Sequence, residues 1–156
     1  MNKFKIISYL ILLALLLTVG FLRDFIFINI NLFSDALLNK STYKLPASLY
    51  LLQNLNYNQL YFLKWVLTIL VSLLYLLIYL YGIWVIYNKQ EKYLIWTLAA
   101  FGFFYILSAC FYFYGWLFQD QDRGYHFARI FIGFVQSPFL LMLLIPGFML
   151  NEVSKK

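Results

Sequence analysis

Long apolar runs alternate with short polar turns along this chain, and the pattern predicts helices that cross a membrane. The clearest run is 65–87, which has 23 residues without a charge and is followed by the polar turn 88–92. Three further runs are of similar length: 4–22, 93–118 and 127–150. A helix of this length crosses about 30 Å of hydrocarbon. We therefore expect four spans.

The first run also resembles a secretory signal peptide, because Lys3 and Lys5 precede it. It ends in Phe21-Leu22-Arg23-Asp24, which contains no small-x-small cleavage site. We therefore expect a retained first helix.

The segment 23–64 remains apolar but is not expected to span. Residues 25–39 fit a helix with two apolar faces and a narrow polar strip. Leu45-Pro46 then interrupts the helix, since the residue before proline leaves the helical region. A second short helix is expected over 46–55. Both pieces are too short for a span, and they suit either the membrane interface or packing on the spanning helices.

Composition supports this fold and excludes other classes. Hydrophobic residues make up 64% of the chain and charged residues 12%, against about 25% charged in ordinary globular proteins. The net charge of +6 does not indicate nucleic-acid binding, because the basic residues flank apolar runs. The tryptophans also fall near the expected helix ends: Trp65, Trp84, Trp96 and Trp116. The predicted fold is all-α, a single domain over 1–156, built as an integral membrane four-helix bundle with short interfacial helices in its first outer loop.

The distribution of basic residues predicts the orientation. Four spans place both termini on the same side as the turn 88–92. Lysines are dense in these short segments: Lys3, Lys5, Lys89, Lys92, Lys155 and Lys156. The positive-inside rule then predicts cytoplasmic termini.

Charged residues gather at the outer ends of the first, third and fourth spans. This predicted outer polar cluster consists of Arg23, Asp24, Asp120, Asp122, Arg123, His126 and Arg129. One interpretation is that these charges only hold the helices at their depth. The other is that Arg23 or Arg129 pairs with an acid and builds an outward-facing docking pocket.

His126 is the only histidine, and a lone interfacial histidine more commonly has a structural hydrogen-bonding role. No second His or Cys lies near it in sequence, so we expect neither a metal nor a cofactor. The run 120–124 superficially resembles a calcium loop but lacks the third acidic ligand and the bidentate Glu.

The fourth span contains Gln136-Ser137-Pro138 and a further proline, Pro146. Proline frees a carbonyl one turn earlier, near Phe134 for Pro138. A side chain can satisfy such a carbonyl, and a kinked helix can also leave a cavity. A fixed kink that shapes packing is the first interpretation, and a cavity of a small transporter or lipid-handling protein is the alternative.

Cys110 lies within the third span and could act as a nucleophile with His126 as base. The helical rise places it about 12 Å below the outer end of its helix, far from His126. We therefore expect a buried structural cysteine, and a membrane thiol hydrolase or transpeptidase remains the alternative.

Two stretches near the ends carry a resemblance to a known group of proteins. They are Leu22-Arg23-Asp24-Phe25 and the series Phe127-Ala128-Arg129-Ile130-Phe131, Gln136-Ser137-Pro138 and Ile145-Pro146. In these residues and in its layout the chain resembles the small membrane proteins encoded beside exosortases, which are membrane cysteine transpeptidases. The resemblance implies a bacterial inner-membrane accessory protein and carries no catalytic residue with it.

Together these features predict a non-enzymatic multi-pass subunit. We expect it to contact the lipid bilayer and to dock onto a larger membrane complex of the cell envelope that sorts or secretes proteins.

Overall fold

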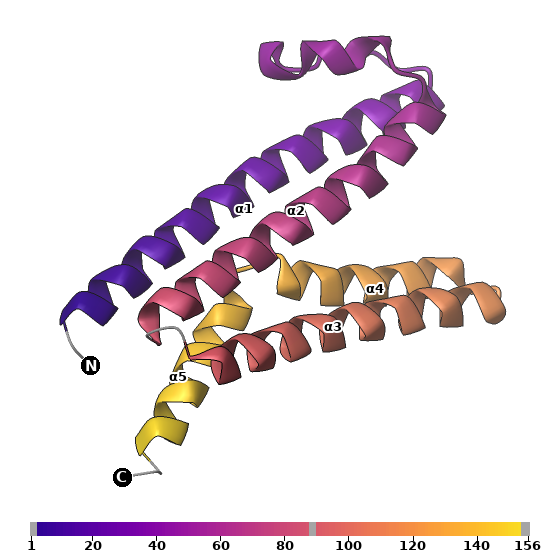
Figure 1. The fold of residues 1–156 in the computed structure, drawn as a ribbon. Coiled ribbons are helices and arrows are strands. Elements are labelled where there is room, and N and C mark those ends of the chain that lie inside the picture. The colour runs from indigo at the N-terminus through magenta and orange to yellow at the C-terminus, as the bar shows by residue number, and fades with distance from the viewer. Residues whose placement is uncertain (1–2, 88–89, 154–156) are drawn as a thin grey trace. The chain divides into compact units, whose positions relative to one another are not determined.

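The computed structural model describes residues 3–87 and 90–153, and side chains for residues 6–87 and 90–150. The described residues form these helical elements: α1 Lys3–Leu38, the 3₁₀ helix η1 Ala47–Asn54, α2 Tyr57–Ile86, α3 Glu91–Leu117, α4 Gln121–Val135 and α5 Phe139–Val153 (Figure 1). Because these described ranges contain no strand, the predicted all-α class is confirmed.

Several helices have the length and composition of membrane spans. Three pass this test by themselves, namely Ile6–Leu38 of α1, and all of α2 and α3. The pair α4 and α5 passes when it is taken as one broken span with a bend of 55°. A multi-pass membrane protein is therefore indicated. The four-helix bundle and the interfacial position of 23–64 stay predictions.

The chain divides into two compact units. One consists of residues 18–73, and the other of residues 1–17 together with 74–156. The division crosses α1 and α2, and each unit has its own set of contacts.

In the 18–73 unit, α1 continues beyond the predicted end of the first span. It runs unbroken to Leu38, so the expectation that Arg23-Asp24 ends the helix is wrong. The reason is local chemistry. No proline or glycine lies between Arg23 and Leu38, and Arg23 pairs with Asp24 along the helix surface. Charged side chains leave the helical backbone hydrogen bonds intact, whereas proline removes one.

The end of α1 and the start of α2 are both closed by local hydrogen bonds. The Ser41 amide donates to the Ala36 carbonyl at 3.0 Å, and Lys40 has a left-handed backbone with φ 52°, as in a Schellman motif. At α2, Asn56 and Gln59 exchange reciprocal main-chain to side-chain bonds of 3.0 Å. This is a capping box, and it starts the helix eight residues before the apolar run 65–87.

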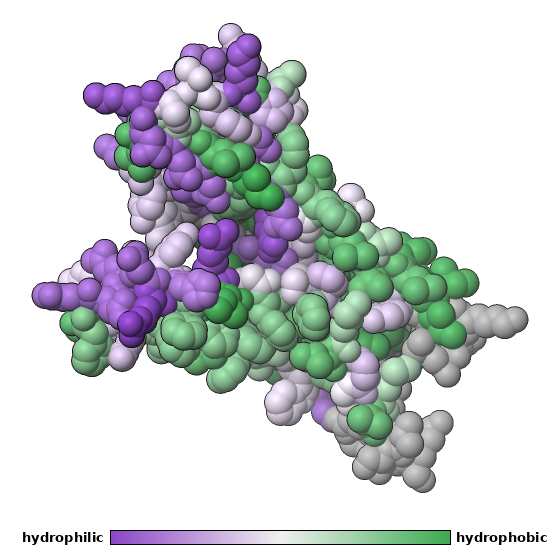
Figure 2. Space-filling view, turned by 180° about the vertical axis from the view of Figure 1, so that it is seen from behind, coloured by the Kyte–Doolittle hydropathy of each residue, from purple (hydrophilic) through white to green (hydrophobic). Residues whose placement is uncertain are grey.

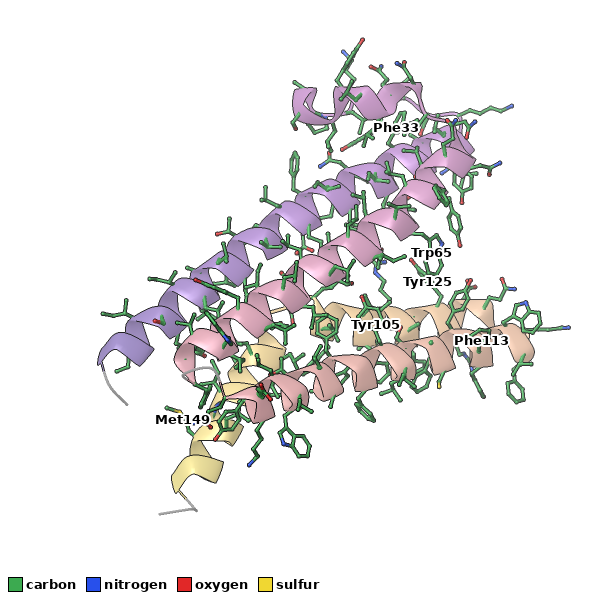
Figure 3. All side chains as sticks on the ribbon, in the orientation of Figure 1. Phe33, Trp65, Tyr105, Phe113, Tyr125 and Met149 are labelled. Carbon is green, nitrogen blue, oxygen red and sulfur yellow. The ribbon has the colours of Figure 1, made fainter. Side chains whose placement is uncertain are left out.

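The core of the 18–73 unit lies between α1, α2 and η1. Its buried centre is Ile30, Phe33 and Leu60, and Figure 3 shows Phe33 between α1 and η1. Residues of the connecting segment pack against this centre, including Tyr43, Leu45, Leu52 and Leu55. The predicted short helix over 46–55 is present as the 3₁₀ helix η1.

In the larger unit, α2 and the residue that follows it carry a row of buried tyrosines, which we call the α2 tyrosine row (Tyr75 and Tyr79 in α2, and Tyr87 directly after it). All three side chains are buried. Each hydroxyl donates to a main-chain carbonyl elsewhere in the unit: Tyr75 to Leu16 (3.0 Å), Tyr79 to Val135 (3.3 Å) and Ser137, and Tyr87 to Ile145 (2.9 Å). The row therefore joins α2 to the N-terminal half of α1, to the break between α4 and α5, and to α5.

The helices α3 and α4 form an antiparallel hairpin (Figure 1). Its backbones approach closely at Gly115 and Gly124, where a Cβ added to Gly124 would lie 2.5 Å from the Gly115 Cα. Further along, the Ser108 hydroxyl donates to the Ala128 carbonyl at 2.8 Å. Small residues permit this approach because no side chain separates the two helices.

The two prolines of the last apolar run behave differently. Pro138 coincides with the break between α4 and α5, whereas α5 continues through Pro146. The predicted fourth span over 127–150 is therefore two helices that meet at residues 136–138.

Candidate interaction site

Asp120 is the N-cap residue of α4, and Arg123 lies in the first turn of that helix. The Asp120 carboxylate accepts a hydrogen bond from the Arg123 amide at 3.4 Å, as an N-cap residue does. It also pairs with the Arg123 guanidinium, whose Nε lies 3.2 Å from Oδ2. Gln119 precedes the cap with a left-handed backbone, φ 55°. Within the predicted outer cluster, these two charges therefore have a structural role.

A second set of polar residues lies on the outer face of α4. Asp122, His126 and Arg129 are spaced four and three residues apart, which places them in one line along a helix. We call them the α4 polar stripe. All three side chains are exposed, whereas Gly124 and Ala128 on the same helix are buried. The packing of α4 through its small residues thus turns the stripe outward.

No side chain of the α4 polar stripe forms a hydrogen bond or ion pair with another of the described residues. Arg129 is the notable member, because Ile130, Phe131 and Ile132 follow it directly. Figure 2 shows hydrophilic residues gathered at the tip of the α3–α4 hairpin, and a mostly hydrophobic surface along it. In sequence, Arg129 is therefore a cation at the start of an apolar run.

The remaining two residues of the predicted outer cluster lie in the 18–73 unit. Both Arg23 nitrogens Nε and Nη2 donate to the Asp24 Oδ1, at 2.9 Å and 2.6 Å. The Arg23 side chain is partly buried and that of Asp24 is exposed. The two charges thus compensate each other on the surface of α1, and the predicted cluster consists of two groups in different units.

The predicted kink residues lie at the break between α4 and α5. The Ser137 hydroxyl donates to the Phe134 carbonyl at 2.7 Å, so a side chain bonds the carbonyl near Phe134. Gln136 is buried. Tyr79 reaches the same place, and its hydroxyl donates to Val135 and Ser137. The break is therefore packed by α2, which favours a fixed kink over an open cavity at this point.

Cys110 does not lie in the packed interior. Its side chain is exposed on α3, so the expectation of a buried structural cysteine is wrong. The buried residues of α3 are Tyr93, Thr97, Phe101, Ser108 and Gly115, and Cys110 is on the opposite side of the helix. Among the described residues no hydrogen bond joins its thiol to His126.

Sequence reasoning missed the polar contacts that hold the 18–73 unit together. The Lys64 ammonium donates to the Asn31 side chain at 3.0 Å. The Tyr43 hydroxyl donates to the Asn29 side chain at 2.7 Å. The sequence feature that could have indicated these contacts is the polar strip of residues 25–39, which contains both asparagines on an otherwise apolar helix.

Comparison with protein-family models, with curated proteins and with solved structures found no match to this chain.

Proposed function

We propose that the protein is a multi-pass accessory subunit that docks onto a larger membrane complex through the α4 polar stripe. The observation that supports this most directly is the environment of Arg129. Its guanidinium is exposed, and among the described residues it has no acidic or hydrogen-bonding partner. A membrane-embedded partner with a carboxylate at this depth would supply one.

The position of Arg129 along α4 also supports docking. It is nine residues after the helix cap Asp120, about 13 Å along the axis. It belongs to a bent helix pair that is apolar enough to be a span. A cation near hydrocarbon costs several kcal/mol unless it reaches the headgroups or finds a counter-charge. Asp122 and His126 on the same line add a hydrogen-bond acceptor and a further polar contact.

The cellular setting is part of the proposal. The resemblance to proteins encoded beside exosortases favours a complex of the bacterial inner membrane that sorts or secretes envelope proteins. Cytoplasmic termini follow from the lysines of the short loops. Most of these lie outside the residues whose side chains are described, namely Lys3, Lys5, Lys89, Lys155 and Lys156.

The proposal is tested by purifying the tagged full-length protein in mild detergent from cells that contain its natural partners. Arg129→Ala should lose most of the partner protein that the wild type recovers, measured by quantitative mass spectrometry, while the variant still inserts. Arg129→Lys retains the charge and should recover part of it. Arg123→Ala is the matched control, because Arg123 is already paired with Asp120.

Arg23→Ala provides a second test, in the other unit. Because Arg23 is paired with Asp24, its removal should weaken partner recovery less than Arg129→Ala does. Unchanged recovery by Arg129→Ala, or a wild type that recovers no partner, would contradict the docking function.

A further inference from the structure

The 3₁₀ helix η1 has one face that packs inward and another that is left uncovered. Leu52 and Leu55 contact the core around Ile30, Phe33 and Leu60. This packing fixes the direction in which the rest of η1 points. The uncovered face is therefore a surface held in place by the fold.

Two large apolar side chains stand at the centre of that outer face. Leu51 is 86% exposed and Tyr50 65% exposed. Among the described large hydrophobic residues, Leu51 has the highest exposure. Leu49 and Leu52 beside the pair are partly buried, and the nearest exposed residues on either side along η1 are Ser48 and Gln53. A small apolar centre with a polar rim is typical of elements that lie on a membrane surface.

The charge of the segment before η1 has one sign. Lys40 and Lys44 are exposed, and the sequence from 36 to 90 contains no Asp or Glu. Anionic lipid headgroups attract such lysines within a Debye length. The charge is therefore complementary to a phospholipid surface.

Contacts within the 18–73 unit also indicate the depth of η1. The pair of Lys64 with Asn31 and the pair of Tyr43 with Asn29 lie at one level of α1. The neighbouring Trp65 is partly exposed. Lys64 and Trp65 stand inside α2 where its charge-free apolar run begins, and tryptophan and lysine at the end of an apolar run mark the boundary between hydrocarbon and headgroups. Since η1 packs against Ile30 and Phe33, it lies at this same level.

We infer that the outer face of η1 binds the headgroup layer of an anionic phospholipid bilayer. Leu51 and Tyr50 insert into the boundary, and Lys40 and Lys44 contact lipid phosphates. η1 packs on α1 and α2, which are themselves suited to cross the bilayer, and this favours lipid over an acidic protein as the occupant. This inference is independent of docking through α4.

The test places a single nitroxide label at chosen positions of the full-length protein in nanodiscs that contain anionic phospholipid. Cys110→Ser provides the cysteine-free background. Leu51→Cys reports on the outer face, and Gln53→Cys on the polar rim. Ile69→Cys, at a 55% exposed position of α2, provides the reference for contact with hydrocarbon. For each label, the accessibility to oxygen is divided by the accessibility to a water-soluble nickel complex.

The ratio for Leu51→Cys should be several-fold higher than that for Gln53→Cys and should approach that for Ile69→Cys. Replacing both lysines (Lys40→Gln with Lys44→Gln), or omitting the anionic lipid, should lower the ratio at residue 51 but not at residue 69. A label at 51 as accessible to nickel as the label at 53 would overturn the inference. So would a label at 51 that is protected from both reagents, because this indicates cover by a protein or by a second copy of the chain.

Discussion

The α2 tyrosine row and the α4 polar stripe differ in whether their side chains form hydrogen bonds within the protein. The hydroxyls of the α2 tyrosine row are all bonded to main-chain carbonyls of the same unit. The side chains of the α4 polar stripe are exposed and bond none of the described residues. In an apolar surrounding, an unmade hydrogen bond is costly. A polar line that bonds inside the chain therefore serves its architecture, whereas one that does not is available to a partner.

The close approach of α3 and α4, which turns the stripe outward, should be the most sensitive feature. Gly124→Ala would place a Cβ 2.5 Å from the Gly115 backbone, so the hairpin must open. Overpacking of this kind costs about 1–3 kcal/mol. The free energy of unfolding, measured by titration with SDS in mixed micelles, should fall by that amount. Partner recovery should fall with it, because the stripe loses its position.

Gly133→Ala is the matched control on the same helix. Nothing lies within 4 Å of a Cβ added there, and alanine favours a helix over glycine by about 1 kcal/mol. The stability should therefore stay the same or rise. Equal losses for the two substitutions would show that the glycine contact does not hold the hairpin.

The α2 tyrosine row should show a smaller loss of stability. Tyr79→Phe retains the ring but removes the hydroxyl from the Val135 and Ser137 carbonyls. Hydrogen bonds between membrane helices contribute about 0.6 kcal/mol on average and at most about 1.7 kcal/mol. We expect a loss near the upper end in the same SDS titration, because these carbonyls lie at the end of α4, where the backbone lacks intrahelical donors.

Tyr81→Phe is the control for Tyr79→Phe. Tyr81 is 66% exposed, so loss of its hydroxyl should leave the free energy of unfolding unchanged. If Tyr79→Phe were as stable as Tyr81→Phe, the tyrosine row could not be what holds the break between α4 and α5.

The helices and the break at Pro138 could be predicted from the sequence because they depend on local chemistry. Apolar length indicates a span, and the proline removes a donor at a known offset, so the free carbonyl near Phe134 could be predicted. The start of α2 at Tyr57 was not predicted, although Asn56 and Gln59 have the spacing of a capping box. The continuation of α1 past Arg23 differs from the prediction, because the charged pair Arg23-Asp24 interrupts the apolar run without ending the helix.

The direction in which each helix face points could not be predicted. α3 is apolar on all sides, so no periodicity distinguishes the side with Cys110 from the side with Ser108. The hydrogen-bond acceptors of the tyrosine row could not be predicted either. Its spacing places the three rings near one face of α2, but their acceptors are main-chain carbonyls far along the chain. Such partners leave no side-chain pattern in the sequence.

Apart from the two controls, the smallest change in stability is expected at Arg129, and it tests most directly whether the two polar lines differ in role. Arg129→Ala removes an exposed side chain that bonds none of the described residues. Surface substitutions of this kind change the free energy of unfolding by no more than about 0.5 kcal/mol. If Arg129→Ala lost partner recovery at unchanged stability while Tyr79→Phe lost stability at unchanged partner recovery, the two polar lines would have separate roles. A marked loss of stability in Arg129→Ala would instead mean that the arginine supports the fold, and the docking role would lose its main support.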